Sequence, residues 1–156
     1  MKVKEYLSQA QRLKRRMKIE REKVEELMSA IEYKSPSFEA IGSFSGGNND
    51  KIPDAIAEAI EYKAKYDTIR AEYARKYCEI EQTINSIEDL EEREVLERRY
   101  LLGERWDSKY NAETNEYIIG IADKLGCSVR QAQRKHGTAL TKIKIPENSQ
   151  ITKKSK

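Results

Sequence analysis

The chain has 156 residues, of which 37% are charged and 38% apolar, and its formal net charge is +3. This composition is too polar for one large globular core, and it favours long, solvated helices with narrow apolar seams. No run approaches the ~18 apolar residues that a membrane-spanning helix needs, and the first residues lack an apolar signal-peptide region. We therefore expect an intracellular protein without a membrane partner.

Two long helices are predicted in residues 1–87. Apolar side chains recur at alternating spacings of three and four in residues 3–31, with Glu20 at the one missing place, and residues 53–87 repeat the pattern. Because a narrow seam left in water gains nothing, we expect a coiled-coil-like antiparallel hairpin, closed on itself or on a second copy in a homodimer. The seam positions are Val3, Tyr6, Ala10, Leu13, Met17, Val24, Leu27 and Ile31, then Ile56, Ala59, Tyr62, Tyr66, Ile69, Tyr73, Tyr77, Ile80, Ile84 and Ile87.

Between these helices, residues 34–53 are rich in Pro, Ser, Gly and Asn, so we expect a flexible loop. Pro53 suits a first helical position. The basic run at residues 12–18 is most simply a solvated face beside the seam, and the alternative is a second contact to nucleic acid or polymerase. Residues 1–87 are thus the first predicted domain.

Residues 88–145 form the second predicted domain, which begins with a helix over residues 90–101. Gly103, directly after this helix, suits a C-cap. The apolar side chains expected near one face of the helix are Leu90, Val95, Leu96, Tyr100 and Leu101.

The rest of this domain is predicted to contain a loop, a short helix and a last helix. The loop covers residues 107–116, the short helix lies in residues 117–126, and the last helix begins at Ser128. Residues 146–156 are polar and carry lysines without a seam, so we expect a disordered basic tail.

The break between the last two helices predicts a helix-turn-helix. Ala122 provides a small residue where the helices would cross, and Gly126 tolerates the positive φ that such a turn needs. Ile121 and Leu125 would anchor the first helix to the core, and Ser128 can cap the second.

The last helix has two contrasting faces on a helical wheel. Its inner face gathers Val129, Ala132, His136, Ala139, Leu140 and Ile143. Its outer face is slim and basic, as a helix entering a DNA major groove must be. Residues 116–156 also carry nine Lys/Arg against three Asp/Glu, which favours a polyanionic partner.

The predicted interface binds double-stranded DNA through nine residues. Guanidinium and amide groups are expected to probe bases, lysines to meet phosphates, and two hydroxyl residues lie at the same face. These residues are Arg130, Gln131, Gln133 and Arg134 for bases, Lys135, Lys142 and Lys144 for phosphates, and Ser128 and Thr138.

No catalytic site is predicted. The chain has one His and two Cys, Cys78 and Cys127, which lie far apart and form no metal-binding motif. His136 falls on the inner face, which favours a packed imidazole rather than a catalytic one. With no activated nucleophile and no evident carboxylate pair, we expect no enzyme, no metal and no cofactor.

The segments EEREVLERRYLLG, IADKLGCS and TALTKI resemble region four of bacterial sigma factors over residues 90–145. Together with the N-terminal helices, the chain is similar to sigma-like regulators of phages and prophages, such as the ArpU and RinA type of late-transcription activator. The positions that carry the resemblance are Val95, Leu96, Arg99 and Tyr100, then Ile121, Ala122, Leu125, Gly126 and Ser128, then Ala139, Leu140, Lys142 and Ile143.

The resemblance implies an all-α transcription regulator in the cytoplasm of a bacterial host cell, which binds promoter DNA and contacts RNA polymerase. The chain departs from the family pattern at the long insertion 107–116 and at Lys135, where an inward apolar residue is usual. Nothing resembles the sigma segment that melts promoters, so we expect an activator or adaptor that binds duplex DNA without opening it.

Two other classes of protein share these features. Small terminase subunits, which act in phage DNA packaging, also join a helix-turn-helix to oligomerising helices. A coiled-coil interaction scaffold would need only the helical seams, and the basic helix would then be incidental.

Overall fold

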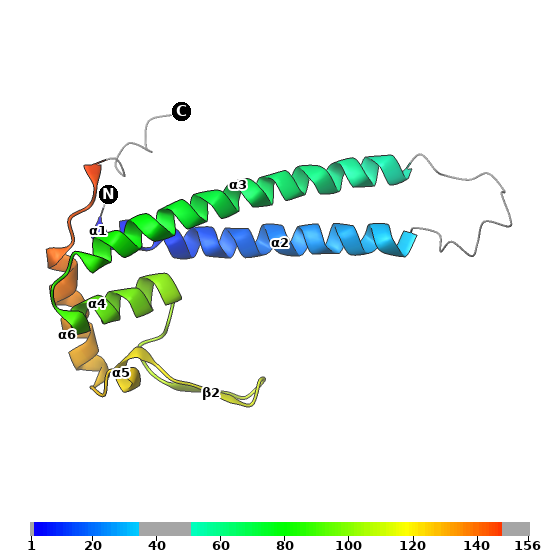
Figure 1. The fold of residues 1–156 in the computed structure, drawn as a ribbon. Helices are drawn as coiled ribbons and strands as arrows, with labels where there is room; N and C mark the ends of the chain where they lie inside the picture. Colours follow the sequence, from blue (N-terminus) through cyan, green and yellow to red (C-terminus); the bar gives the residue numbers. More distant parts are fainter. Residues whose placement is uncertain (1, 35–50, 148–156) are drawn as a thin grey trace, which may run out of the picture. The chain divides into compact units, whose positions relative to one another are not determined.

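The computed structural model describes residues 2–34 and 51–147, and these residues are mostly helical (Figure 1). The predicted loop 34–53 and the predicted tail 146–156 therefore lie largely outside the described residues. The elements in chain order are α1 (Val3–Leu7), α2 (Gln9–Lys34), α3 (Lys51–Asn85), α4 (Leu90–Leu96), the π-helix η2 (Glu97–Leu102), β1 (Lys109–Asn111), β2 (Glu116–Ile118), α5 (Ile121–Lys124) and α6 (Val129–Lys142).

By their contacts, the described residues fall into two compact units. The core unit comprises residues 2–12 and 74–147, and the hairpin unit comprises residues 13–34 and 51–73. The sequence placed its first domain boundary at residue 87. In the structure, residues 2–12, at the start of the first long helix, and residues 74–85, at the end of the second, belong to the same unit as the C-terminal part of the chain.

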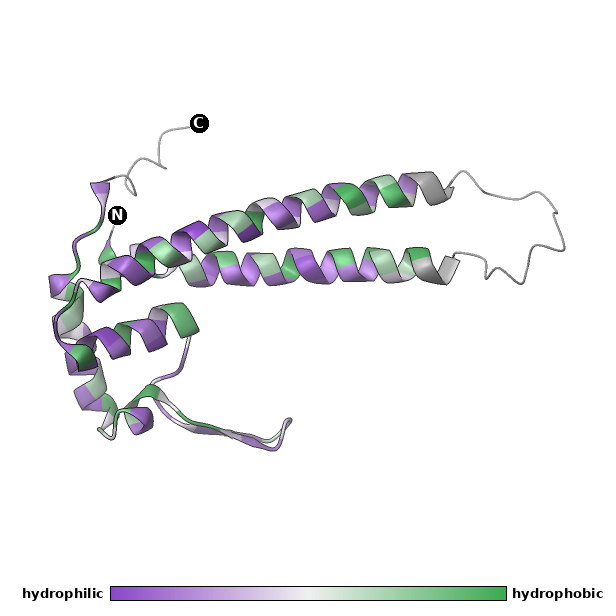
Figure 2. Ribbon diagram, viewed as in Figure 1, coloured by the Kyte–Doolittle hydropathy of each residue, from purple (hydrophilic) through white to green (hydrophobic). Residues whose placement is uncertain are grey.

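The hairpin unit contains an antiparallel pair of helices. The Lys23 ammonium lies 5.8 Å from the centre of the Tyr62 ring, and Arg16, earlier in α2, lines the same hollow as Ile69, later in α3. Apolar and polar residues alternate around both helices, as Figure 2 shows by colour. The seam is confirmed in α2, where the predicted positions from Leu13 to Ile31, Glu20 included, are the less exposed ones, and in α3 from Ala59 to Tyr73. The prediction was wrong at Ile56, which is 43% exposed.

The core unit buries the same seam much more completely. Tyr6, Ile80 and Ile84 have no exposed surface, and the Tyr6 hydroxyl lies 2.9 Å from Thr83 Oγ1, so the buried phenol has a polar partner. Leu7, which the predicted seam omits, is equally buried. Val95 and Leu96 of α4 are also fully enclosed, and they belong to the same compact unit.

Both long helices differ slightly from the predicted bounds. The first is interrupted at Ser8, whose hydroxyl donates to the Lys4 carbonyl at 2.7 Å alongside the Ser8 amide, so side chain and backbone share one acceptor. The second begins at Lys51. Pro53 therefore stands in the first helical turn, where its missing N–H would have had no intrahelical partner.

The helix predicted over residues 90–101 is present as α4 followed by η2. Asp89 caps it by accepting a 2.9 Å hydrogen bond from the Glu92 amide, and Gly103 ends it with φ 77°, as predicted. Leu90 was wrongly placed on the inner face, because it lies in the first turn and is 72% exposed. The Leu101 carbonyl accepts a 2.6 Å hydrogen bond from Gln11, which satisfies one acceptor at the helix end.

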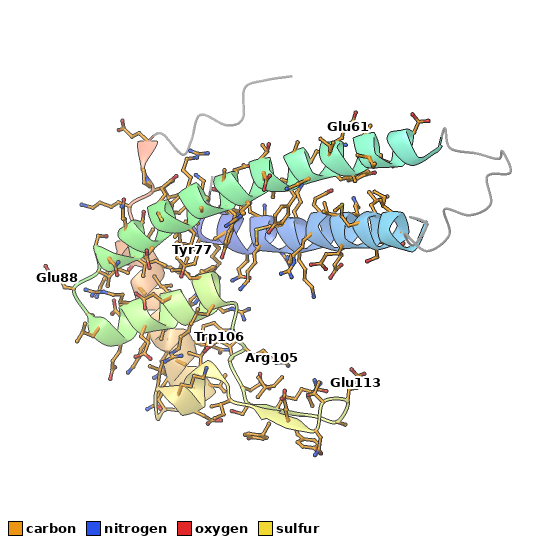
Figure 3. The ribbon with its side chains drawn as sticks, turned by 45° about the vertical axis from the view of Figure 1, so that its right-hand side comes forward. Glu61, Tyr77, Glu88, Arg105, Trp106 and Glu113 are labelled. Carbon is orange, nitrogen blue, oxygen red and sulfur yellow. The ribbon has the colours of Figure 1, made fainter. Side chains whose placement is uncertain are left out.

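The prediction of a loop over residues 107–116 was wrong. β1 and β2 form an antiparallel hairpin in which Tyr110 pairs with Tyr117, and Figure 3 marks its turn by Glu113. Asn111 Oδ1 accepts from the Glu113 amide at 3.1 Å, and Asn115 adopts φ 54°, so the turn follows from asparagine chemistry. The signal that could have revealed the hairpin is a turn-forming run between two tyrosines.

The short helix α5 begins at Ile121 rather than within residues 117–120 as predicted. A Cβ on Gly120 would lie 2.4 Å from the carbonyl carbon of Asp107, so only glycine permits this close approach. The approach brings the carbonyls of Arg105 and Trp106 to the amides of Ile121 and Ala122, at 2.9 and 3.1 Å. The free amides at the start of α5 are thereby satisfied.

Candidate nucleic-acid interface

The turn between α5 and α6 has the geometry that the sequence predicted. Gly126 adopts φ 61°, its amide donates to Asp123, and the Cys127 amide donates to the Ala122 carbonyl at 3.0 Å. Ala122 is buried, as a residue at a close helix crossing must be. The chain therefore reverses sharply between two helices instead of continuing as one rod.

The start of α6 is fixed by a reciprocal cap. The Ser128 hydroxyl accepts a 3.2 Å hydrogen bond from the Gln131 amide, and the Gln131 side chain accepts one from the Ser128 amide at 2.9 Å. This capping box satisfies two amides that the helix itself leaves free. The side chains of Ser128 and Gln131, which were predicted to contact DNA, thus cap the N-terminus of α6.

The predicted inner face of α6 is confirmed. Ala132, Ala139 and Ile143 are buried, and Val129, His136 and Leu140 are partly buried. The small alanines let α6 lie close against α4 and α5, with which it packs. The inner face therefore fixes which side of α6 is left to solvent.

His136 lies in an aromatic cluster with Tyr100 and Trp106. Its Nε2 lies 3.0 Å from the Tyr100 hydroxyl, its ring stacks on Tyr100, and the edge of Trp106 meets it at 5.1 Å. Burial lowers the pKa of His136 to about 4, with smaller effects from Lys4 and Arg99. A neutral imidazole packed between aromatic rings at pH 7 agrees with the expected structural role.

Two of the lysines predicted to meet phosphates are paired with acids of α4. Lys135 forms an ion pair with Glu91, and this hydrogen bond raises the pKa of Lys135. Lys142 Nζ lies 2.7 Å from Oε2 of the buried Glu92, and the two form an ion pair. Both lysines therefore hold α6 against α4, and removing Lys142 would leave a buried carboxylate without its partner.

The outer face of α6 is basic and open. Arg130, Gln133 and Arg134 are exposed, and among the residues that the structure describes none of them makes a side-chain hydrogen bond or ion pair. Thr138 is also exposed, and its hydroxyl donates to the Arg134 carbonyl at 3.2 Å. Lys144, just beyond the helix, is exposed as well.

The structure thus divides the nine predicted residues into three groups. Arg130, Gln133, Arg134 and Lys144 are free to meet a ligand, whereas Lys135 and Lys142 are tied to α4. Ser128, Gln131 and Thr138 use their side chains on the backbone of α6 itself.

The sequence missed the exposed apolar surface of the β-hairpin. Tyr110 and Tyr117 form a cross-strand pair with both rings exposed, and Ile118 and Ile119 are exposed as well. The base of the hairpin is tied to α5 by Ser108, which accepts from the Gly120 amide at 2.8 Å and bonds Asp123. Arg105 and Trp106 lie where the chain approaches α5 (Figure 3).

Comparison of the chain with protein-family models, with curated proteins and with solved structures finds no match. Among residues 2–34 and 51–147, no cluster of three or more His, Cys, Asp or Glu side chains could hold a metal ion. Over the same residues, no helix combines the length and the apolar character that crossing a bilayer requires.

Proposed function

We propose that the core unit binds double-stranded DNA in a sequence-dependent way, with α6 in the major groove. One observation carries this proposal: Arg130 and Arg134 project from one exposed face of α6 and have no acidic partner within residues 2–34 and 51–147, while the other face of α6 packs on α4 and α5. Arginine pairs with the two acceptors of guanine in the major groove, and each such contact is worth about 1–3 kcal/mol of discrimination.

The shape of α6 supports the same proposal. A helix with its side chains is about 10–12 Å across and the major groove is about 12 Å wide, so only a slim helix enters. The outer face of α6 carries no acid, and the N-terminal half of the helix holds the free Arg130, Gln133 and Arg134. Recognition helices contact base edges with their N-terminal residues.

The biological role that we propose is regulation of transcription, in a chain of phage or prophage origin. The resemblance to sigma region four favours promoter DNA as the target and RNA polymerase as a second partner. The turn at Gly126, the cap at Ser128 and the buried Ala122 are what a helix-turn-helix of that kind requires.

Selection of bound fragments from random duplexes, followed by titrations at several salt concentrations, tests the proposal. The Arg130→Ala, Arg134→Ala double variant should lose at least tenfold in preference for the selected site over random duplex. Lys144→Ala should weaken all duplexes alike and reduce the salt slope by about 1. Arg70→Ala, an exposed arginine of the hairpin unit, is the matched control and should change neither quantity.

Unchanged site preference in the double variant would overturn the assignment. Failure of the wild type to bind any duplex at low salt would leave the interaction scaffold as the better description. Lys142→Ala is unsuitable as a test of phosphate binding, because loss of the ion pair with Glu92 would destabilise the fold.

A second function, an oligomeric DNA-packaging component, is favoured by the surface of the hairpin unit. Met28, Ile56 and Ile60 are exposed there, and most of the seam is only partly buried. A two-helix unit with such a surface gains stability when further copies cover it. Mass photometry separates the two functions, because a ring of many copies supports packaging and a monomer or dimer supports regulation.

A further inference from the structure

Gly137 occupies a place in α6 where the fold itself has no use for a glycine. It lies inside the continuous helix Val129–Lys142, and a Cβ placed on it would meet no atom within 4 Å among the described residues beyond the adjoining backbone of α6. Its φ is not positive, whereas Gly103 and Gly126 have the left-handed conformation that favours glycine. Gly120 has a packing reason, because its Cβ would strike the backbone of Asp107.

A glycine in a helix interior lowers helix stability relative to alanine, since it adds conformational freedom to the unfolded chain. Among the residues that the structure describes, neither close packing nor a positive φ requires a glycine at position 137. The reason for a glycine here is therefore sought in a molecule that α6 contacts outside this chain.

The position of Gly137 on α6 indicates which molecule this is. Gly137 follows Arg130 by seven residues and Arg134 by three, so at about 100° per residue it lies on the same face as both arginines. All three residues are exposed. Gly137 is also about 12 Å along the helix axis from Val129, at the end remote from the capped N-terminus.

We propose that Gly137 is where a wall of the DNA major groove, the sugar-phosphate backbone of one strand, comes closest to the main chain of α6. A helix with full side chains already fills a groove about 12 Å wide, so the absence of a side chain at this turn lets α6 enter more deeply. The arginines one and two turns earlier then reach base edges. This inference rests on the proposed function and adds a steric determinant of affinity to it.

Substitution of Gly137 by uncharged residues tests the inference, because stability and binding should move in opposite directions. Gly137→Ala and Gly137→Gln should melt at or above the temperature of the wild type, as glycine is replaced by better helix formers. At fixed salt, affinity for the selected duplex should fall about threefold for Gly137→Ala and at least tenfold for Gly137→Gln, as the larger side chain meets the groove wall. The slope of affinity against salt should stay unchanged, because no charge is altered.

Ala71→Gln, which places the same side chain on an exposed helical position of the hairpin unit, is the matched control and should leave binding unchanged. Wild-type affinity in Gly137→Gln would overturn the inference alone and leave the proposed function standing. A lower melting temperature in Gly137→Ala would also overturn it, since the glycine would then serve the fold. No binding by the wild type at low salt would overturn the proposed function, and the inference with it.

Discussion

The same two helices run through two different surroundings, and the contrast separates what a heptad pattern specifies from what it does not. In the core unit Tyr6, Ile80 and Ile84 are fully buried, whereas in the hairpin unit Met17 and Tyr66 occupy equivalent seam positions and are only partly buried. Periodicity fixes which side of a helix faces its partner. How completely that side is covered depends on the rest of the chain, here on the residues that share the core unit.

The largest expected effect comes from truncating the same residue type in the two surroundings. Ile84→Ala, in the core unit, should lower the free energy of unfolding by about 2–5 kcal/mol, because it removes a fully enclosed side chain and leaves a cavity. Ile60→Ala, at a 63% exposed position of the same helix, should stay within about 0.5 kcal/mol of the wild type. Urea denaturation followed by circular dichroism measures both.

The outcome for Ile60 also bears on assembly. A cost at Ile60→Ala that approaches the cost at Ile84→Ala, and that grows with protein concentration, would show that a second copy covers the hairpin unit. The contrast between the two units would then hold only for the isolated chain.

The parts of the structure that the sequence predicted are those set by nearby residues. Gly103, Gly126 and Ser128 end or begin helices through their own backbone preferences or hydroxyl, and the inner face of α6 follows from helical periodicity. Both signals lie within a few residues of the feature that they determine. Local chemistry was therefore enough to place the turn and to orient α6.

The parts that the sequence did not predict depend on contacts between distant residues. The start of α5 depends on the close approach of Gly120 to Asp107, and Lys135 and Lys142 are tied to acids more than forty positions earlier in the chain. A single helical wheel assigns those lysines to the ligand because it contains no information on α4. For the nine predicted site residues, the pairing of these two lysines with acids of α4 is the main feature that the sequence did not reveal.

One contribution to the pH dependence of stability should come from His136, the one histidine of the chain. Its folded-state pKa of about 4 lies below the ordinary value of 6.5, because burial disfavours the imidazolium. The unfolded chain therefore binds more protons between these values, so the contribution is complete above pH 6.5 and is lost as pH falls to 4. After allowance for partial solvent exposure, the loss should amount to about 1–2 kcal/mol.

Proton NMR titration of the imidazole measures this directly, and the midpoint should lie near pH 4. Denaturation of the wild type and of His136→Gln between pH 7 and 4.5 gives the energetic consequence, as the variant should lose less stability over this interval. Carboxylates titrate in both proteins, so the difference between them isolates the imidazole. A midpoint near 6.5 would show that the cluster with Tyr100 and Trp106 is open to water.

The smallest expected effect concerns the cap of α6. The start of this helix can depend on the local cap and on packing against distant residues. Ser128→Ala removes the hydroxyl that accepts from the Gln131 amide and should lower the free energy of unfolding by about 1 kcal/mol. Ser128→Gly should lower it by only a few tenths of 1 kcal/mol, and Ser29→Ala, at an exposed serine near the end of α2, should have no measurable effect. Equal losses in Ser128→Ala and Ser29→Ala would mean that the inner face of α6, through its burial against α4 and α5, fixes the start of the helix without help from the cap.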